Sequence, residues 1–174
     1  PGTKKKVWDM AREMDYQPNQ VAQSLRKSST RTLGVIIPGY IIPFYSLSIS
    51  GIQDQAYENG YNIITCQSNE SQEMEKANIR TLLASKVDGI ILSLSKETKD
   101  YGHIFKLKEK GVPFVFFNRT INNKNFCRVL VDDYHGGYQV TRHLIERGYQ
   151  RIAHVMGPKN LIISQNRLNG FFKA

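Results

Sequence analysis

The stretch NQVAQSLRKSSTRTLGVII, residues 19–37, joins a short polar helix to a buried strand and separates two different parts of the chain. Its last five residues, Leu33–Ile37, are a continuous apolar run rich in β-branched side chains, typical of a strand covered on both faces. Asn19 is a good N-cap for a helix ending near Arg26. Three apolar side chains share one face of that helix: Val21, Ala22 and Leu25. A helix this short is marginal in water, so we expect it to need a partner.

Downstream, the chain alternates between predicted strands and predicted helices. The strands begin near residues 33, 61, 88 and 113, at intervals of 28, 27 and 25 residues. This is the repeat of βαβ units, and right-handed crossovers between such units give a doubly wound parallel sheet. Amphipathic helices are predicted between the strands, at 44–59, from Asn69 or Ser71 to 84, and at 98–110. Beyond them we predict a strand, a helix, a sixth strand and a further helix, at 128–131, 133–146, 151–156 and from Leu161 onward.

The basic charge is concentrated upstream of this alternation. The chain of 174 residues carries a net charge of +9, and residues 1–32 hold seven Lys or Arg against three Asp or Glu. Within them, Lys4–Met14 has helical periodicity, and Pro18 ends that helix. A basic helical arm suggests a polyanionic partner, most simply nucleic acid. From charge alone, a solvated basic surface explains the pattern equally well.

Composition and cysteine content indicate an ordinary globular protein of a reducing compartment. Hydrophobic residues make up 40% of the chain and charged residues 22%, which allows a sizeable core. Cys66 and Cys127 each border an apolar run, and we expect both to be buried free thiols. The N-terminus lacks the apolar core of a signal peptide, and no apolar run approaches membrane-spanning length. We therefore expect a cytoplasmic protein with no membrane partner.

The sequence contains no catalytic signature. There is no GxSxG, P-loop, HExxH, CxxC or dinucleotide-binding GxGxxG motif. Asp132, Asp133 and His135 form a close acid–histidine cluster, but these residues open a predicted helix, and helix capping accounts for Asp133. We therefore expect no enzyme activity, no metal site and no cofactor.

Polar and aromatic residues gather just past the predicted strand ends. Ligands of open α/β sheets bind in the crevice at the carboxyl ends of the strands. Aromatic faces beside an arginine and a carboxylate suit a polyhydroxylated ligand, which has apolar ring faces to stack and hydroxyls to fix. Taken singly, each such residue is more often a turn or surface residue, but their convergence on one edge predicts a site. The residues are Tyr40, Phe44, Tyr45, Ser93, Ser95, Asn118, Arg119 and Asp132.

An ordered series of motifs gives the chain a family resemblance. The segment DYQPNQVAQSLR, residues 15–26, followed by TLGVIIP at 32–38, resembles the headpiece–hinge–core junction of LacI/GalR-type bacterial transcription repressors. The series continues in the family's order through VDGIIL at 87–92, VDD at 131–133 and GYQRIA at 148–153, over nearly the whole chain. The resemblance implies a doubly wound parallel sheet of periplasmic-binding-protein-like type I, with an N-terminal helical arm and a hinge helix.

The resemblance also implies a function and a domain organisation. The chain would belong to a dimeric regulator that binds operator DNA and holds a small molecule, a sugar or related metabolite, between two core subdomains. Residues 1–18 would end the DNA-binding headpiece, 19–32 form the hinge helix and linker, 33–132 the N-terminal subdomain, and 133–174 the start of the C-terminal subdomain. A chain truncated at both ends is expected. The alternative is a solute-binding protein of transport or chemotaxis, against which the basic arm and the missing secretion signal argue.

Individual roles follow from the same resemblance. Leu25 would enter the minor groove and unstack a base step. Val21 and Ala22 would pack against the hinge helix of the second subunit, while Asn19 and Arg26 would lie near phosphates. Effector contacts are implied for Phe44, Tyr45, Ser93, Ser95, Arg119, Asp132 and Arg167.

The sequence departs from the family's pattern at two places. Gly39–Ile42 occupies a loop where the family usually has an Asn before its Pro-aromatic pair and an Asp near the strand end, which leaves room for a ligand other than a common sugar. Asp15 stands where a Gly usually ends the helix.

Overall fold

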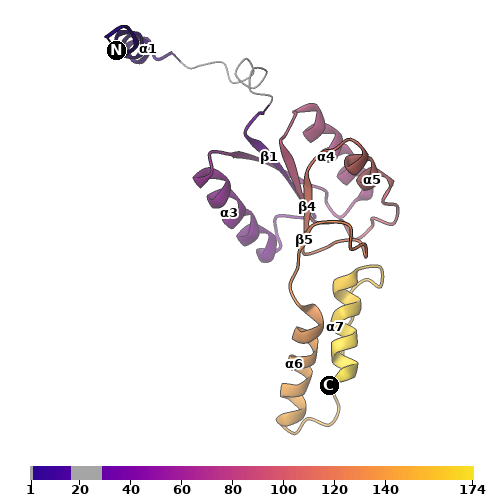
Figure 1. Cartoon of the computed structure of the whole chain (residues 1–174). Helices are drawn as coiled ribbons and strands as arrows, with labels where there is room; N and C mark the ends of the chain where they lie inside the picture. Colours follow the sequence, from indigo (N-terminus) through magenta and orange to yellow (C-terminus); the bar gives the residue numbers. More distant parts are fainter. Residues whose placement is uncertain (1, 17–28) are drawn as a thin grey trace. The chain divides into compact units, whose positions relative to one another are not determined.

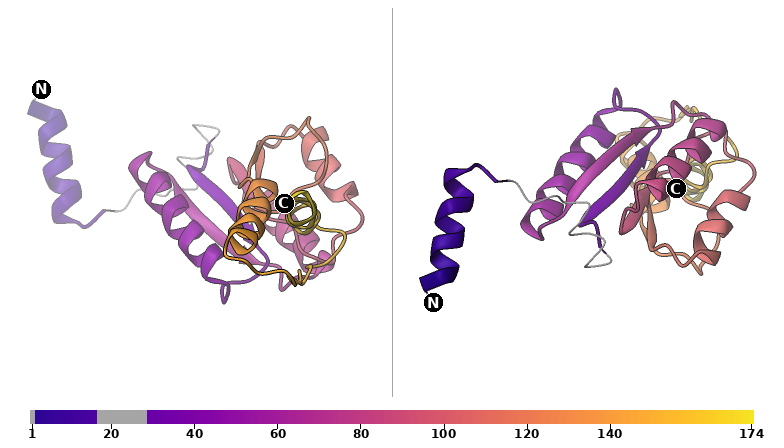
Figure 2. Two further views of the ribbon diagram at one scale, coloured as in Figure 1. Left: turned by 90° about the horizontal axis from the view of Figure 1, so that it is seen from below. Right: turned by 90° about the horizontal axis from the view of Figure 1, so that it is seen from above.

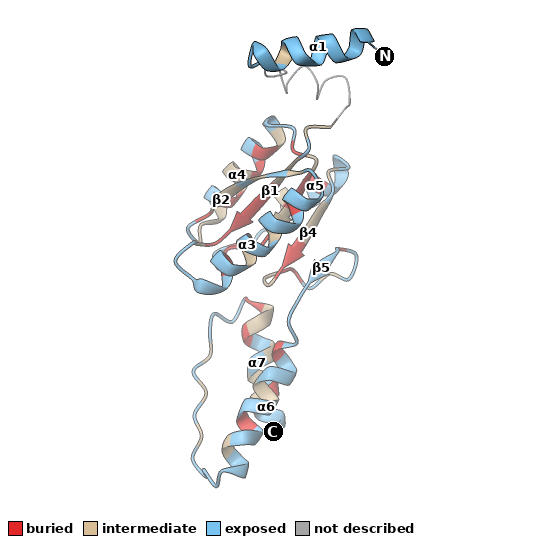
Figure 3. Cartoon of the chain, turned by 90° about the vertical axis from the view of Figure 1, so that its left-hand side faces the viewer, coloured by how far each residue is buried: buried red, intermediate tan, exposed pale blue. Residues whose placement is uncertain are grey.

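The structure, a computed structural model, describes residues 2–16 and 29–174, and the chain divides into two compact units, Pro1–Thr30 and Arg31–Ala174. In the first unit, helix α1 spans Gly2–Glu13, which confirms the predicted N-terminal helix (Figure 1). None of the residues of α1 is buried (Figure 3). The residues predicted to contact DNA lie outside the described residues: Asn19, Val21, Ala22, Leu25 and Arg26.

Asp15 ends α1 in a backbone conformation that favours glycine, with a φ of 47°. The Tyr16 N–H donates to the Ala11 carbonyl at 2.8 Å, and the Asp15 N–H donates to the Arg12 carbonyl at 3.1 Å. These two bonds form a Schellman motif, whose left-handed position is usually Gly. Asp is one of the few other residues that adopt this conformation. Asp15 therefore fills the capping position that the sequence pattern assigns to Gly.

The second unit contains a five-stranded sheet in which all neighbouring strands are parallel. The strands lie in the order β2-β1-β3-β4-β5, so the chain changes direction across the sheet between β1 and β3. This confirms the predicted doubly wound parallel sheet. The strands are β1 Thr32–Ile37, β2 Asn62–Gln67, β3 Gly89–Leu92, β4 Phe114–Phe117 and β5 Arg128–Val129.

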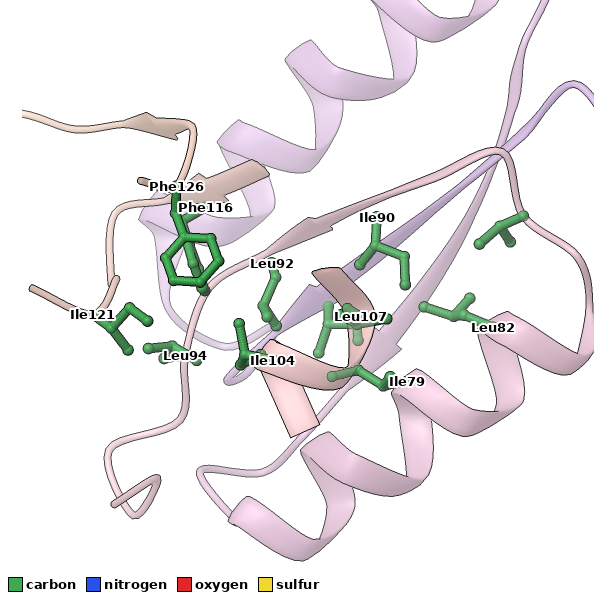
Figure 4. Packing of buried hydrophobic residues seen from close by; sticks show 12 residues of the cluster. Ile79, Leu82, Ile90, Leu92, Leu94, Ile104, Leu107, Phe116, Ile121 and Phe126 are labelled. Atoms are coloured by element: carbon green, nitrogen blue, oxygen red, sulfur yellow. The ribbon is translucent and has the colours of Figure 1, made fainter. Parts of the chain in front are cut away.

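Helices cover both faces of the sheet (Figures 1 and 2). Helix α3 lies on one face and α4 and α5 on the other, and they span Pro43–Glu58, Gln72–Ala84 and Gly102–Glu109. Successive side chains of β1 point to opposite faces. Val35 and Ile37 therefore pack with Tyr45 of α3, whereas Ile36 joins the larger core beneath α4 and α5. Figure 4 shows this larger core, to which α4 contributes Ile79 and Leu82 and α5 contributes Ile104 and Leu107. No helix in the described part of the chain is both long and apolar enough to cross a membrane.

Two local features fix the position of α4. The Ser71 hydroxyl accepts the Met74 N–H at 3.4 Å, so Ser71 is the N-cap of the helix. At the other end, Gly34 of β1 lets the helix approach the sheet closely. A Cβ atom on Gly34 would lie 2.5 Å from Cδ1 of the fully buried Leu82. A larger residue at position 34 would therefore clash with Leu82 and push α4 away from the sheet.

Helices α6 (Asp133–Glu146) and α7 (Ile162–Lys173) form where the sequence predicts helices, and they pack side by side (Figure 1). Their backbones approach closely at Gly137 of α6 and Gly170 of α7. A Cβ atom on Gly137 would lie 2.5 Å from the carbonyl oxygen of Arg167. A helix pair without bulky side chains at its crossing packs at short range because the backbones themselves are in contact.

The predicted sixth strand does not form. Residues 151–156 adopt no strand, and Val155 is 96% exposed. A strand is stabilised when a neighbouring strand satisfies its backbone N–H and C=O groups. In the sheet formed by the described residues, no strand pairs with this segment. The apolar pattern of residues 151–156 suits a strand, but the described residues provide no neighbouring strand with which it could pair.

The two cysteines differ in their surroundings. Both are free thiols, but only Cys66, in β2, is partly buried, whereas Cys127 is exposed. The prediction of two buried thiols is therefore wrong for Cys127 and holds only in part for Cys66. The reason is that Cys127 precedes β5, a two-residue edge strand whose residues are themselves exposed. Burial raises the pKa of the Cys66 thiol, because the thiolate loses hydration.

Candidate ligand-binding site

Loops that follow several strands meet at the carboxyl edge of the sheet, and Tyr45 joins three of them. This residue, in the first turn of α3, is 1% exposed, and its hydroxyl lies 3.0 Å from the Ser93 hydroxyl after β3. Asn118, directly after β4, donates its side-chain N–H to the Tyr45 hydroxyl at 3.0 Å. Since Asn118 is the donor, the hydroxyl hydrogen of Tyr45 remains available for Ser93. Tyr45 therefore braces the site from within.

Phe44 precedes Tyr45 in α3 and, unlike Tyr45, faces solvent. Its side chain is 42% exposed, and its ring meets the Tyr45 ring edge to face, with centroids 5.4 Å apart. The preceding loop is also open, with Tyr40 41% and Ile41 96% exposed. Phe44 therefore offers a free ring surface on which a ligand can stack, supported from behind by Tyr45.

Arg119, in the loop after β4, is held by Glu70 in the loop after β2. The Nη1 atom of Arg119 donates to Glu70 Oε2 at 2.7 Å and to the Leu94 carbonyl at 3.4 Å. The same oxygen of Glu70 accepts the backbone N–H of Lys96 at 2.7 Å. Glu70 itself adopts a left-handed conformation, with a φ of 62°. Its carboxylate thus ties together the loops after β2, β3 and β4.

The surroundings of Glu70 favour its charged form. Burial, the largest single influence, raises the pKa of this carboxyl. The hydrogen bonds from the Arg119 side chain and the Lys96 backbone, with the positive charges of both residues, together outweigh burial and bring the pKa below its ordinary value of 4.5. At neutral pH, Glu70 and Arg119 therefore form an ion pair.

Ser93 and Ser95 are buried and bonded within the protein. Ser93 is 0% exposed and Ser95 is 1% exposed. The Ser95 hydroxyl lies 2.7 Å from the Ser68 hydroxyl, and the Ser95 backbone N–H donates to Glu75 Oε2 at 2.7 Å. Both serines therefore hold the loop after β3 in place.

Glu75 of α4 anchors the same loop from below. It is fully buried, and its Oε1 atom accepts a hydrogen bond from the Thr98 hydroxyl at 3.1 Å and lies 2.7 Å from His103 Nε2. Together with the Ser95 contact, these bonds satisfy both oxygens of the buried carboxylate. Glu75 thus links α4, the loop after β3 and α5.

The acidic residues at the start of α6 depart from the prediction. Capping was predicted for Asp133, but Asp132 is the N-cap, and its Oδ1 atom accepts the His135 N–H at 2.9 Å. Asp133 lies in the first turn, is 7% exposed, and its Oδ1 atom accepts a 2.7 Å bond from Arg167 Nε. The contact with α7 occupies the carboxylate of Asp133, so its more exposed neighbour caps the helix.

The predicted ligand contacts fall into two groups. Five of them belong to what we call the strand-edge cluster: Phe44, Tyr45, Ser93, Ser95 and Arg119. The other two lie on the helix pair: Asp132 and Arg167. A hydrogen bond of 2.6 Å, from the Asn160 side chain to the Lys96 carbonyl, connects the loop before α7 to the loop after β3. Among the described contacts, this bond joins the loops that carry the two groups, and no predicted ligand residue of one group bonds to one of the other.

The residues predicted from the sequence did not include Glu70, Ser68 or Glu75. The first two follow β2 at the same edge, so the rule that selected residues after the other strands would have included them. Glu75 gave no such signal, because a glutamate on an amphipathic helix usually faces water. Only the folded structure shows that Glu75 points inward.

This arrangement suits a polar small molecule that also has an apolar face. Phe44 supplies a ring for stacking, and Arg119 supplies fixed hydrogen-bond donors. Around them, the site is braced by hydrogen bonds from four loops, so its geometry is set before a ligand arrives. Among the described residues, no three His, Cys, Asp or Glu side chains lie close enough together to hold a metal ion.

Residues 30–174 match the family described as periplasmic binding proteins and sugar binding domain of LacI family. The match covers most of the chain, and the chain belongs to this family. The resemblance inferred from the ordered motifs is thereby confirmed, as is the periplasmic-binding-protein-like fold.

Individual relatives are transcription regulators. The chain is 29% identical over 172 residues to the HTH-type transcriptional repressor PurR of Actinobacillus pleuropneumoniae serotype 5b (strain L20), over 99% of this chain and 51% of that protein. The transcription regulator CcpA of Lactococcus lactis matches with a TM-score of 0.75 and 29% identity, over 82% of this chain and 52% of that one. The Cra transcriptional dual regulator of Pseudomonas putida, in complex with fructose 1-phosphate, matches with a TM-score of 0.77 and 26% identity, over 83% and 53%. The chain spans about half the length of the curated relatives it matches.

Proposed function

We propose that this chain is part of a ligand-responsive bacterial transcription regulator. The regulator binds operator DNA as a homodimer and a small molecule between two core subdomains. The observation that carries the proposal is the strand-edge cluster, in which Tyr45 contacts both the exposed Phe44 and the donor Arg119. The ring centroids of Phe44 and Tyr45 lie 5.4 Å apart, and the guanidinium carbon of Arg119 lies 6.0 Å from the Tyr45 ring centroid. The relatives named above are regulators, and the Pseudomonas putida protein was solved with a sugar phosphate. Because such a regulator acts on DNA, we place it in the cytoplasm.

In this proposal, the two groups of residues form opposite walls of one ligand site. The strand-edge cluster belongs to the subdomain of residues 33–132. Asp132 is the last residue of that subdomain and caps α6, and Arg167 belongs to the second subdomain, residues 133–174. The Asn160–Lys96 bond supports a closed arrangement, because it joins the loop before α7 to the loop that Glu70 holds. The ligand would stack on Phe44 and accept hydrogen bonds from Arg119.

The DNA-binding part of the proposal concerns residues 1–32. The hinge helix, residues 19–26, would order on DNA, with Leu25 inserted in the minor groove and Val21 and Ala22 packed against the second subunit. Asn19 and Arg26 would lie near phosphates. The net charge of residues 1–32, seven basic against three acidic side chains, supports this assignment.

The experiment that tests the function uses the full-length protein. An operator is first selected from random DNA, and calorimetric titration then measures its affinity at physiological salt with and without a panel of sugars. We expect operator binding well above binding to unrelated DNA, and a change in affinity with at least one small molecule. Operator affinity no higher than that for unrelated DNA contradicts the regulator assignment.

A solute-binding protein is the second candidate, because the matched family includes periplasmic binding proteins. The same titrations separate the two candidates. Ligand binding without any specific DNA binding favours a solute-binding protein, whereas a ligand that changes operator affinity excludes it as the sole function.

A further inference from the structure

Both arginines proposed to contact the ligand are already paired with a carboxylate of the same chain. Arg119 Nη1 lies 2.7 Å from Glu70 Oε2, and Arg167 Nε lies 2.7 Å from Asp133 Oδ1. Charge-assisted bonds of this length are strong, and each carboxylate neutralises its guanidinium locally. The site therefore contains two arginines without an excess of positive charge.

The Arg119 pair is the more enclosed of the two. The side chain of Arg119 is 12% exposed and that of Glu70 is 22% exposed, whereas the Arg167 side chain is 56% exposed. Interactions between charges that are sheltered from water are screened less than those at the surface. Lys96 also acts on Glu70 through its charge, but this residue is exposed, so water and salt screen its ammonium group. Glu70 is therefore the neighbouring charge that offsets the Arg119 guanidinium with the least screening.

Arg119 retains donors for an uncharged acceptor. A guanidinium has five N–H groups. The two bonds to Glu70 and Leu94 both come from Nη1, so Nη2 takes part in neither. A hydroxyl or carbonyl oxygen can accept from the remaining donors while the ion pair stays intact. A phosphate or carboxylate would instead lie beside the Glu70 carboxylate or displace it, and displacement would break the bond between the Glu70 carboxylate and the Lys96 N–H.

We infer that the site selects an uncharged polar ligand over a phosphorylated or carboxylated one, and that Glu70 is the residue that determines this selectivity. The inference rests on the proposed function, since it names the ligand class of the proposed site. It distinguishes this chain from a regulator that holds a sugar phosphate, such as the Pseudomonas putida relative.

Inorganic phosphate is a direct probe of this selectivity. In the full-length protein, phosphate is titrated to millimolar concentration while the NMR signals of the Arg119 side chain and the Lys96 backbone N–H are followed. The wild type is expected to show no saturable shift. Glu70→Gln keeps the size of the side chain and an oxygen that can accept from Arg119, but it removes the charge. We expect this variant to bind phosphate at least about tenfold more tightly than the wild type.

Glu73→Gln is the matched control. Glu73 is an exposed carboxylate on α4 that pairs with Lys76 at 3.1 Å, so its substitution makes the same change in net charge outside the site. This control should behave as the wild type does. Saturable phosphate binding by the wild type at Arg119 overturns the inference, and equal phosphate affinity of Glu70→Gln and the wild type removes Glu70 from the role.

Matched sugars extend the test to ligands. Calorimetry compares fructose with fructose 1-phosphate, and ribose with ribose 5-phosphate. In any pair that binds, the wild type is expected to prefer the neutral sugar, and Glu70→Gln to shift the ratio toward the phosphate by about tenfold. A wild-type preference for the phosphorylated sugar contradicts the inference. The phosphate titration requires no operator, so failure of the proposed function and failure of this inference are separate results.

Discussion

Asn118 and Tyr45 are 73 positions apart in the sequence, yet the amide of one donates to the hydroxyl of the other across 3.0 Å. The bond joins the end of β4 to the first turn of α3, on a part of the edge where Phe44 is exposed and Tyr45 is not. One residue of the aromatic pair thus serves as a support while its neighbour faces solvent. This division of roles gives the first prediction.

Tyr45→Phe should destabilise the protein by about 1–3 kcal/mol, because the substitution leaves the buried Ser93 hydroxyl and the Asn118 amide each short of a partner. Urea unfolding measures the change. Tyr57→Phe, on the same helix with its side chain 81% exposed, is the control and should stay within about 0.5 kcal/mol of the wild type. Equal effects of the two substitutions would remove the bracing role of the Tyr45 hydroxyl.

Neighbouring glycines of α6 should respond in opposite ways to the same substitution. A Cβ atom at Gly136 meets nothing within 4 Å, whereas one at Gly137 lies 2.5 Å from the backbone of Arg167. Gly136→Ala should raise stability by up to about 1 kcal/mol through helix propensity. Gly137→Ala should lower it by about 1–3 kcal/mol, because α7 must move. Thermal unfolding followed by circular dichroism checks both, and a stabilised Gly137→Ala protein would contradict the close crossing.

The Glu70 ion pair should make stability depend on pH on the acid side. The folded-state pKa of Glu70 is lowered from 4.5, so its contribution is complete above the unfolded-state value and is lost as pH falls through the folded-state value. The stability difference between the wild type and Glu70→Gln should therefore be constant near neutrality and shrink below about pH 4.5. Urea unfolding from pH 7 to pH 3 measures this difference. A difference that does not vary over this range would show that the carboxylate charge is not responsible.

The two thiols should react with a disulfide reagent at different rates. Cys127 is exposed, whereas Cys66 is partly buried and its pKa is raised, so less of it is the reactive thiolate. Ellman's reagent at mildly alkaline pH should give one fast and one slow phase in the native protein. Cys127→Ser should abolish the fast phase, and Cys66→Ser the slow one. A single phase with both thiols present would contradict the difference in burial.

Substitutions in the proposed hinge should change operator affinity, and substitutions in the proposed ligand site should change effector affinity. In the full-length protein, Leu25→Ala is expected to weaken specific operator binding by about tenfold or more, since the wedge is lost, with effector affinity nearly unchanged. Arg167→Ala is expected to do the reverse, with DNA binding kept and the effector response lost. Fluorescence anisotropy with labelled operator and calorimetry with effector measure the two affinities. Unchanged operator binding by Leu25→Ala, or an unaltered ligand titration of Arg167→Ala, would refute the respective role.

The fold could be predicted from the sequence because its signals are local. A strand buried on both faces needs a continuous apolar run such as Leu33–Ile37, and the covering helices need a 3.6-residue stripe, so each βαβ unit is visible by itself. The segment 151–156 differs from these strands. Its residues suit a strand, but whether a strand forms depends on a neighbour that local patterns do not reveal.

The gathering of the candidate residues at one edge of the sheet could be predicted from the sequence, but the contacts that each residue makes there could not. Parallel strands bring their carboxyl ends to one edge, which is why Phe44 and Arg119 could be selected from sequence. Whether a side chain faces solvent or a partner depends on contacts made across the sheet, so the burial of Ser93 was not foreseeable. The exchange of roles between Asp132 and Asp133 has the same cause, since it is set by Arg167 of a different helix.

The backbone of Lys96 connects the strand edge to the loop before α7. Its backbone N–H is held by Glu70 at 2.7 Å, and its carbonyl holds the side chain of Asn160 at 2.6 Å. A single residue has only two soft torsions, so a rotation that loosens one of these bonds disturbs the other. A change in the Glu70–Arg119 pair is therefore expected to reach the loop before α7 through the backbone of Lys96.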